Sequence, residues 1–251
     1  MTPEIFDIPN YRAGFRFSDE SEDYYNGSDT FHDLAGYGPF AALEITAGTP
    51  AFVTDASGQR GMTLDNTCQG QFRQPIAWEG TIIAIMKASM GTNGFLYPLI
   101  FGGSGPIVNN GRLQVQRINS ASYRYQFSSA SASQFGGVNT ADSNVIAVAL
   151  GLSQETREGY GTEDGTTITT TTAIADDNFG NKVSPAFYTG PTFDGHFVRF
   201  GNLSGTLADT VATSNTMTIF EAHFFGGNPI IDSPTEVQAA LAALRARYGV
   251  A

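Results

Sequence analysis

Short apolar runs, each bounded by glycine, serine or asparagine, make up most of the chain. Residues 81–86 and 145–150 are rich in isoleucine, valine and alanine, and their length favours buried strands over helices. Residues 113–116 and 123–127 alternate apolar with polar side chains, as half-exposed strands do, and a short connection around residues 119–121 separates them, which suits a hairpin. Many short strands without intervening helices indicate an all-β fold, a two-sheet antiparallel β-sandwich of the jelly-roll type.

Three further runs extend this set of expected strands. Residues 95–101 contain Pro98, which lacks a backbone donor and therefore predicts an edge strand or a bulge. Residues 166–172 are rich in threonine and predict a strand exposed on one face. Residues 216–225 predict the last long strand of the sandwich.

One α-helix is expected, over residues 234–248 near the C-terminus. Ser233 opens a capping-box sequence with proline at the first helical position. Arg245 and Arg247 complement the helix dipole in the last turn, and Gly249 follows as a stop signal. The helix has one apolar stripe, which predicts that it packs on the sandwich: Val237, Ala240, Leu241, Leu244 and Tyr248.

Composition excludes several classes of function. The formal net charge is −11 with only 13 Lys and Arg residues, which argues against nucleic acid as a partner. Cys68 is the single cysteine, so neither an internal disulfide nor a cysteine-based zinc site can form. The sequence holds no stretch of 18 apolar residues, so no membrane span is expected. The first residues lack the basic and apolar regions of a secretory signal, so no export signal is expected.

The N-terminal segment is distinct in charge. Residues 1–33 hold eight acidic and two basic residues, more than half of the net charge of −11, interleaved with seven aromatic residues. This pattern predicts an acidic, aromatic arm over residues 1–38, followed by the sandwich with its helix over residues 39–251. Two interpretations of the arm stay open. It packs irregularly on its own domain, or it docks on a partner protein.

Four segments together resemble the concanavalin A-like lectin/glucanase superfamily in its laminin-G-like jelly-roll form: residues 61–65, 80–87, 197–202 and 218–248. The terminal helix ending in Tyr-Gly is common in bacterial and phage-borne modules of this type. The resemblance implies carbohydrate recognition, in some members with bound calcium and in some with glycan cleavage. The Glu-x-Asp-x-x-Glu strand of the glucanases is absent, as are the Gln-x-His and Arg-rich strands of the jelly-roll alginate lyases.

The candidate catalytic pair lies on the last long strand. Glu221 and His223 are two residues apart, which makes them same-face neighbours on a strand, and a carboxylate beside an imidazole can do acid–base work. Alternation along the strand places Met217, Ile219 and Phe225 on that same face. The other interpretation of the pair is a structural hydrogen bond under the helix, and no further carboxylate accompanies the pair in sequence.

Oxygen-rich loops offer metal and sugar ligands. The candidate calcium ligands stand in one loop around Gly180, where an ordinary turn is the alternative: Asp176, Asp177, Asn178 and Asn181. No other cofactor is expected. Sugar sites combine an aromatic face with polar loop residues, and the candidates are Tyr160, Glu163 and Asp164 in the glycine-rich segment 158–165, together with Trp78, the one tryptophan.

The sequence thus predicts a non-catalytic glycan-binding module on the surface of a phage or phage-like particle, as a spike, fibre or host-attachment component. Such a module meets glycans outside the cell, and a virion protein is released by lysis without an export signal. The expected partners are a surface polysaccharide, other particle subunits through the arm, and further copies of the chain. Two alternatives stay open: a glycan-degrading hydrolase or lyase using Glu221 and His223, and a structural decoration protein without ligand.

Overall fold

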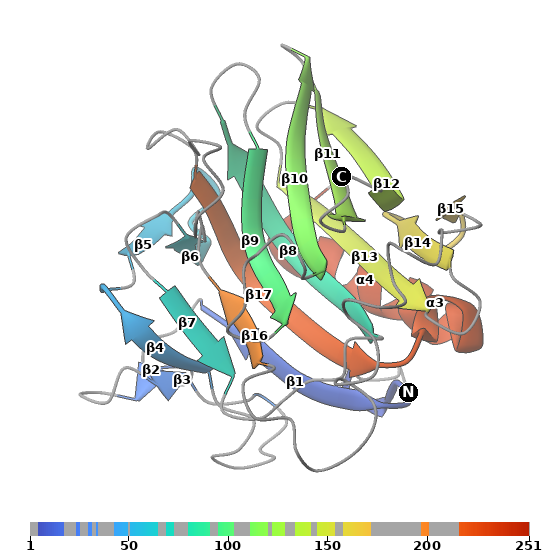
Figure 1. Cartoon of the computed structure of the whole chain (residues 1–251), viewed down its shortest axis with the longest axis horizontal. Helices are drawn as coiled ribbons and strands as arrows, with labels where there is room; N and C mark the ends of the chain where they lie inside the picture. The colour runs from blue at the N-terminus through green and yellow to red at the C-terminus, as the bar shows by residue number, and fades with distance from the viewer. Residues whose placement is uncertain are drawn as a thin grey trace.

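The structure, a computed structural model, shows two layers of strands with a helix outside them (Figure 1). It describes residues 5–17, 24–25, 30–31, 34, 43–49, 51–64, 69–72, 80–90, 95–102, 111–119, 122–128, 134–141, 145–153, 158–171, 197–200 and 216–250. The elements follow in this order: η1 (Ile5–Asp7), β1 (Tyr11–Arg16), β2 (Tyr24–Tyr25), β3 (Thr30–Phe31), β4 (Leu43–Ala47), β5 (Ala51–Thr54), β6 (Arg60–Leu64), β7 (Gln69–Phe72), β8 (Gly80–Ser89), β9 (Phe95–Gly102), β10 (Gly111–Asn119), β11 (Ser122–Ser128), β12 (Gln134–Ala141), β13 (Ile146–Ser153), β14 (Glu158–Thr162), β15 (Thr169–Thr171), β16 (Phe197–Phe200), β17 (Thr216–Gly226), α3 (Pro229–Asp232) and α4 (Pro234–Tyr248).

The described strands form two antiparallel sheets. One sheet has eight strands in the order β15-β14-β13-β8-β17-β6-β5, with β1 also paired to β17. The other has nine strands in the order β12-β11-β10-β9-β16-β7-β4-β3-β2. The predicted hairpin is β10–β11, where Leu113 faces Phe127. With α4 as the one long helix of the described residues, this architecture confirms the predicted two-sheet β-sandwich.

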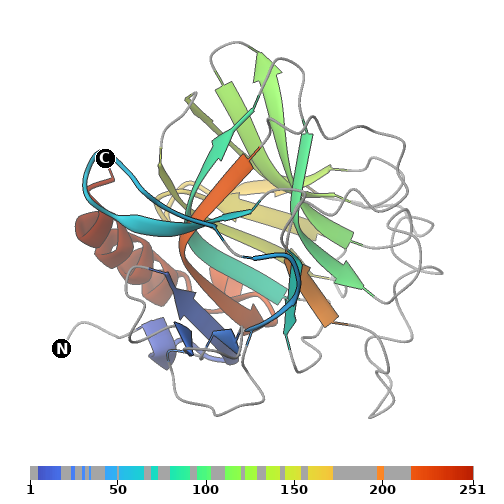
Figure 2. The same ribbon diagram turned by 90° about the vertical axis from the view of Figure 1, so that its left-hand side faces the viewer.

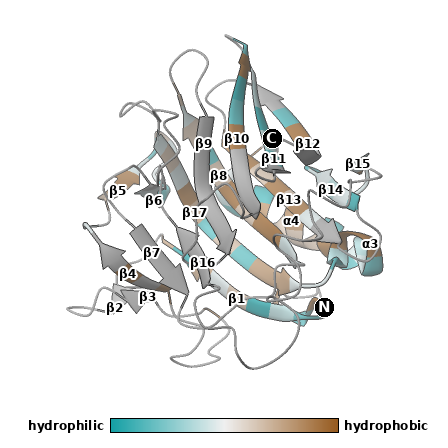
Figure 3. Ribbon diagram, in the orientation of Figure 1, coloured by the Kyte–Doolittle hydropathy of each residue, from teal (hydrophilic) through white to brown (hydrophobic). Residues whose placement is uncertain are grey.

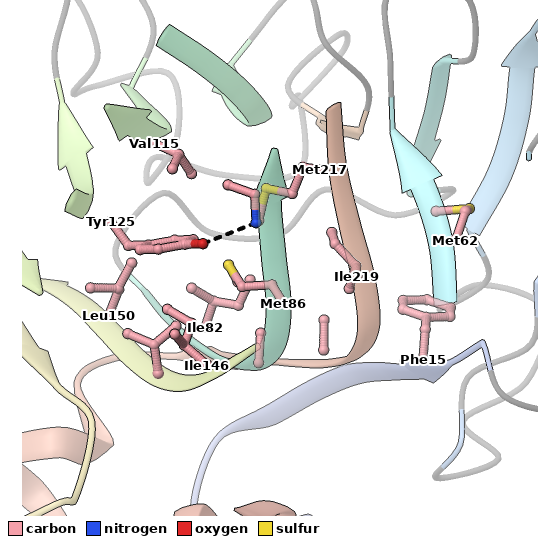
Figure 4. Close-up of a cluster of buried hydrophobic side chains, with 14 of the residues drawn as sticks. Phe15, Met62, Ile82, Met86, Val115, Tyr125, Ile146, Leu150, Met217 and Ile219 are labelled. Carbon is pink, nitrogen blue, oxygen red and sulfur yellow. Dashed lines mark hydrogen bonds between the residues drawn. The ribbon is translucent and has the colours of Figure 1, made fainter. Parts of the chain in front are cut away.

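The main core lies between the two sheets (Figure 4). Ile82 and Met86 of β8 meet Val115 and Tyr125 of the opposite sheet there, and all four side chains are fully buried. The Tyr125 hydroxyl accepts a hydrogen bond from the backbone N–H of Ala88 at 3.1 Å, so this aromatic side chain satisfies its polar atom while it crosses the core.

A second core lies on the outer face of the eight-stranded sheet, under α4 (Figure 2). Ile83 and Ile85 of β8 belong to this outer core, whereas their neighbours Ile82 and Met86 belong to the inner one. Because both faces of β8 and β13 are covered, both strands are continuously apolar rather than alternating (Figure 3). The helix meets the small side chains of Ala147 and Ala149 on β13, which leave room for it.

Helix α4 occupies the predicted residues and buries the predicted stripe, from Val237 to Tyr248. Gly249 ends it in the left-handed region at φ 64°, where its N–H donates to the Arg245 carbonyl. The expected capping box does not form, because the Ser233 side chain makes no cap hydrogen bond. Among the described residues, no helix is both long enough and apolar enough to cross a membrane.

The N-terminal segment enters the sandwich over residues 5–17. Strand β1 pairs with the second half of β17, from Tyr11 opposite Phe225 to Arg16 opposite Glu221. Phe15 and Phe17 are fully buried in the inner core. These residues therefore pack on their own domain. The other parts of the predicted arm, residues 1–4, 18–23, 26–29, 32–33 and 35–38, lie outside the described residues.

Candidate functional site

The candidate pair of β17 lies directly under α4. Ile219 and Ala222 belong to the inner core, and Phe220 belongs to the outer one. A bulge explains this, because Ile219 faces Met86 and Glu221 faces the very next residue, Ile85, on β8. Phe220 and Glu221 therefore both point towards the helix. The expectation that Met217 and Ile219 share a face with the pair is wrong for the same reason, whereas Phe225 lies on the outer face as expected.

Glu221 is fully buried, and its carboxylate accepts hydrogen bonds from three elements. On its own strand, His223 Nε2 lies 2.8 Å from Oε1. From β1, Arg16 donates through Nε at 3.0 Å and through a second nitrogen at 3.3 Å. From α4, Arg247 donates to both oxygens at 2.7 and 2.8 Å, and the Tyr248 hydroxyl donates at 2.9 Å. We call Glu221 with these four partners the Glu221 cluster.

The groups around Glu221 favour the ionised form of its carboxyl group. Burial alone raises the pKa of the Glu221 carboxyl, but the hydrogen bonds and charges of His223 and Arg16 outweigh burial and hold that pKa well below its usual range. An ionised carboxylate only accepts, so the imidazole Nε2 carries a hydrogen that it donates. The other nitrogen, Nδ1, faces the Tyr11 hydroxyl at 3.3 Å. Every polar atom of this carboxylate–imidazole pair thus has a partner.

The Glu221 cluster is closed to a substrate. Glu221 and His223 are each 0% exposed, and the rings of Phe6 and Tyr11 lie about the imidazole at centroid distances of 6.0 and 5.9 Å. Gly14 stands opposite His223, and a Cβ there would collide with the Tyr11 hydroxyl and with His223 Nδ1. The geometry favours the structural interpretation of the pair, in which buried charge joins the first strand, the last strand and the helix.

A cavity of about 370 Å³ lies at the C-terminal end of α4. The turn between β5 and β6, the start of β13, the segment after β14 and the end of α4 form its wall, and Figure 2 shows that turn beside the end of the helix. Its apolar lining is Val145, Ile146, Ala147, Tyr248 and Val250. Its polar side chains are Asp55, Ser57, Glu163 and Arg245. We call it the α4 pocket.

Asp55 is held in place by its own turn. Its Oδ1 accepts from the Ser57 and Gln59 backbone N–H groups, both at 2.9 Å, and from the Ser57 hydroxyl at 2.7 Å. Burial by itself raises the pKa of the Asp55 carboxyl, but these hydrogen bonds lower it below the ordinary value. No described residue donates to Oδ2, so the side chain keeps one oxygen to offer a ligand.

Glu163 and Arg245 line the same pocket without pairing. Burial raises the pKa of the Glu163 carboxyl, the charge of Arg245 lowers it, and that of Asp164 raises it further. No described residue hydrogen-bonds Glu163, and the two opposite charges form no ion pair within 4.0 Å. Arg245 Nε is buried and has no hydrogen-bond partner among the described residues.

The other sequence candidates lie elsewhere. Residues 158–162 form β14 instead of a loop, and Tyr160 is 5% exposed within the outer core, where its hydroxyl bonds Glu158. Asp164 accepts from the Thr166 and Thr167 N–H groups, both at 2.7 Å, and so caps its own turn. Trp78 and the calcium loop with Asp176, Asp177, Asn178 and Asn181 lie outside the described residues. The described residues contain no cluster of three His, Cys, Asp or Glu side chains that could hold a metal ion.

Sequence reasoning selected Glu163 but missed Asp55, Ser57 and Arg245. The Asp-x-Ser-Gly order at residues 55–58 is a turn signal, and a turn reveals neither its neighbours nor a pocket. In the sequence, the helix dipole alone is enough to explain Arg245. Its role in a pocket depends on the position of the β5–β6 turn beside the end of α4, which brings together residues almost two hundred positions apart.

No protein-family model matches this chain, and no curated protein matches it in sequence. Solved structures match it in shape. A sialidase of Trypanosoma rangeli in complex with sialic acid aligns over 94% of this chain and 34% of its own, with a TM-score of 0.56 and 14% identity. The botulinum neurotoxin serotype C1 binding domain aligns over 96% of this chain and 53% of its own, with a TM-score of 0.55 and 11% identity.

This chain therefore spans about a third to a half of the length of those structures. At such identities the likeness concerns the fold, and fold alone does not fix function. Together with the sheet topology, it shows that the chain folds as a two-sheet antiparallel β-sandwich like the matching parts of those structures.

Proposed function

We propose that this chain is a glycan-binding module and that it holds a short saccharide in the α4 pocket. The observation that carries the proposal is a pocket that combines free polar groups with an apolar floor on a lectin-like sandwich. Saccharides present hydroxyl groups at their edges and C–H groups on their faces, and this lining suits both. The volume of about 370 Å³ lies near the lower end of the roughly 300–1,000 Å³ typical of ligand pockets.

The lectin-like neighbours support the proposal at the level of fold. One was solved with sialic acid bound, and another is the binding domain of a neurotoxin. The sealed Glu221 cluster supports a role without catalysis, because a substrate has no route to a carboxylate that is 0% exposed.

A second candidate function, glycan hydrolysis, is favoured by one observation. Asp55 and Glu163 both line the pocket, and their surroundings lower the pKa of the first carboxyl and raise that of the second. Environments that separate two carboxyl pKa values are a feature of acid–base pairs. In this scheme Glu163 would protonate the leaving oxygen and Asp55 would act on the opposite side. Hydrolysis would then reside in the α4 pocket and not at Glu221.

We further propose that the module is displayed on a phage or phage-like particle, where many copies would multiply weak single contacts into strong attachment. What supports this setting is the composition: only 15% charged residues with abundant glycine, together with an acidic, aromatic N-terminal segment. The particle's other subunits and further copies of this chain would be its protein partners. A surface polysaccharide would be its ligand.

The test is incubation of the purified protein with capsular and lipopolysaccharide glycans, following retention on the immobilised glycan and chain length in the same samples. We expect retention with unchanged chain length, and at least a tenfold loss of retention in Arg245→Gln. Arg12→Gln, a change at an exposed arginine of β1 outside the pocket, is the matched control and should bind normally. Absence of retention on every glycan would refute glycan binding. Shortened chains that disappear in Glu163→Gln would establish the hydrolase.

A further inference from the structure

We propose that the α4 pocket selects neutral saccharides, with adjacent hydroxyl groups bridging Glu163 and Arg245, and that it rejects saccharides carrying a carboxylate. The inference rests on the proposed function and assigns a ligand class to its site. In this proposal, Asp55 is a second side chain that accepts hydrogen bonds from the hydroxyl groups of the saccharide. None of these three residues contributes to the Glu221 cluster.

Glu163 and Arg245 carry opposite charges but do not form an ion pair with each other. A carboxylate and a guanidinium that share a partly desolvated pocket usually form an ion pair, because each loses hydration there. Glu163 and Arg245 line one pocket and do not pair within 4.0 Å. A group that both donates and accepts can join them. A hydroxyl donates to the carboxylate and accepts from the guanidinium, and a vicinal diol does both at two neighbouring atoms.

The second step is a buried donor without a partner. Arg245 Nε is shielded from solvent, and no described residue accepts from it. Leaving this donor unmatched costs stability, and because solvent does not reach Nε, a ligand would be held by the terminal guanidinium nitrogens instead. The Gly249 and Val250 N–H groups both bond the Arg245 carbonyl, which fixes the backbone from which this side chain extends. The pocket therefore presents a guanidinium on a fixed backbone position.

The third step is the balance of charge. The polar lining carries two carboxylates, Asp55 and Glu163, against the one guanidinium of Arg245. Asp164 adds a further negative charge next to Glu163. An anionic sugar would gain from Arg245 but would face these carboxylates in a site of reduced dielectric. Repulsion of this kind is how a site discriminates between ligands of equal shape.

The fourth step is the floor of the pocket. Val145 and Val250, both half-buried, offer aliphatic surface beside the polar groups. The C–H face of a pyranose ring can lie on that surface while its hydroxyl edge reaches the charged pair. The acceptor and donor groups thus hydrogen-bond the hydroxyl groups at the edge of the ring, and the aliphatic side chains pack against its face.

The experiment compares three methyl glycosides, those of glucose, galactose and mannose, with the three corresponding methyl uronosides. Each pair differs only at carbon 6, where a hydroxymethyl group becomes a carboxylate. Binding to the full chain is measured by ligand-observed NMR and calorimetry. We expect at least one neutral glycoside to bind at least tenfold more tightly than its uronoside. Arg245→Gln should weaken that binding at least tenfold, whereas Arg12→Gln should leave it unchanged.

A second variant isolates the repulsion. Glu163→Gln keeps the size of the side chain and one acceptor oxygen but removes its charge. It should raise the affinity for the uronoside relative to its neutral partner at least threefold, and a circular dichroism melt verifies that the variant is folded. Uronosides that bind as tightly as the neutral glycosides would overturn the inference while glycan binding stands. Failure of all six to bind would also overturn it, and polysaccharide retention would then decide the proposed function separately.

Discussion

Replacing Glu221 by glutamine removes the one negative charge that joins β1, β17 and α4. The variant leaves Arg16, which is 26% exposed, without its carboxylate, and it leaves the fully buried His223 beside an amide. Removing one partner of a buried, hydrogen-bonded ion pair costs about 3–5 kcal/mol of unfolding free energy. For a chain of this size each kcal/mol lowers Tm by roughly 2–4 °C, so the expected decrease is about 6–20 °C.

Differential scanning calorimetry measures this effect, with two controls. Arg247 is 46% exposed, so Arg247→Gln removes a largely solvated partner and should cost no more than about 1 kcal/mol. Asp232→Asn removes an acidic charge from an exposed position of α3 and should leave Tm unchanged. A Tm of Glu221→Gln within 2 °C of the wild-type Tm corresponds to a loss of roughly 1 kcal/mol or less of unfolding free energy. That result would refute the view that this buried charge holds the three elements together.

Acid titration tests the same idea through the sign of the pKa shift. The pKa of Glu221 is lowered in the folded state, so its contribution to stability is complete above the unfolded value of about 4.3. That contribution is lost as the pH falls below this value towards the folded pKa. The stability difference between the wild type and Glu221→Gln should therefore be largest near neutral pH and shrink in acid. A difference that stays constant from pH 7 to pH 3 would contradict the assignment.

Three further perturbations test the packing. Gly14→Ala should lower the unfolding free energy by about 1–3 kcal/mol, since its Cβ would collide with Tyr11 and His223, and an unchanged melt would show that the strands can move apart. Deletion of residues 1–17 removes β1 and should abolish the cooperative transition, and a soluble, cooperatively folding remainder would show that β1 is dispensable. Tyr160→Ala opens the outer core and should cost about 3–5 kcal/mol in a denaturant titration, whereas loss of glycan binding at full stability would return Tyr160 to the binding site.

The elements that sequence predicted best are those with a strong local pattern. Helix α4 combines an apolar stripe with a terminal glycine, and its bounds match the expected residues 234–248. The bulge expected at Pro98 is present, since Leu99 faces Leu113 and Leu96 faces Val115, so two residues of β9 stand against one of β10. Both patterns are local, and no distant contact is needed to predict them.

The predictions that failed depend on contacts between distant segments. The bulge at Phe220 turns Glu221 onto the outer face, and strict alternation cannot detect it, because every residue from Met217 to Phe225 other than Thr218 is buried on one face or the other. The aromatic N-terminal segment shows no period, yet β1 pairs with a strand more than two hundred residues away. Burial on both faces removes the polar alternation from which sequence analysis assigns faces.

Within the candidate site, too, one residue had a local sequence signal and the others did not. Glu163 stood out because it lies in a polar, glycine-rich segment, whereas Asp55 and Arg245 looked like a turn residue and a helix-end residue. They form one pocket only when the β5–β6 turn meets the end of α4. Each residue was unremarkable in its local context, so a site assembled from a turn, a strand and a helix end carries no local sequence signal.

The most direct test of saccharide binding in the α4 pocket is a crystal structure of the protein with a bound neutral saccharide. We expect one sugar ring in the α4 pocket, with hydroxyl groups within hydrogen-bond distance of Glu163 and Arg245 and with its C–H face on Val145 and Val250. A saccharide bound on any other surface, with the α4 pocket empty, would contradict it.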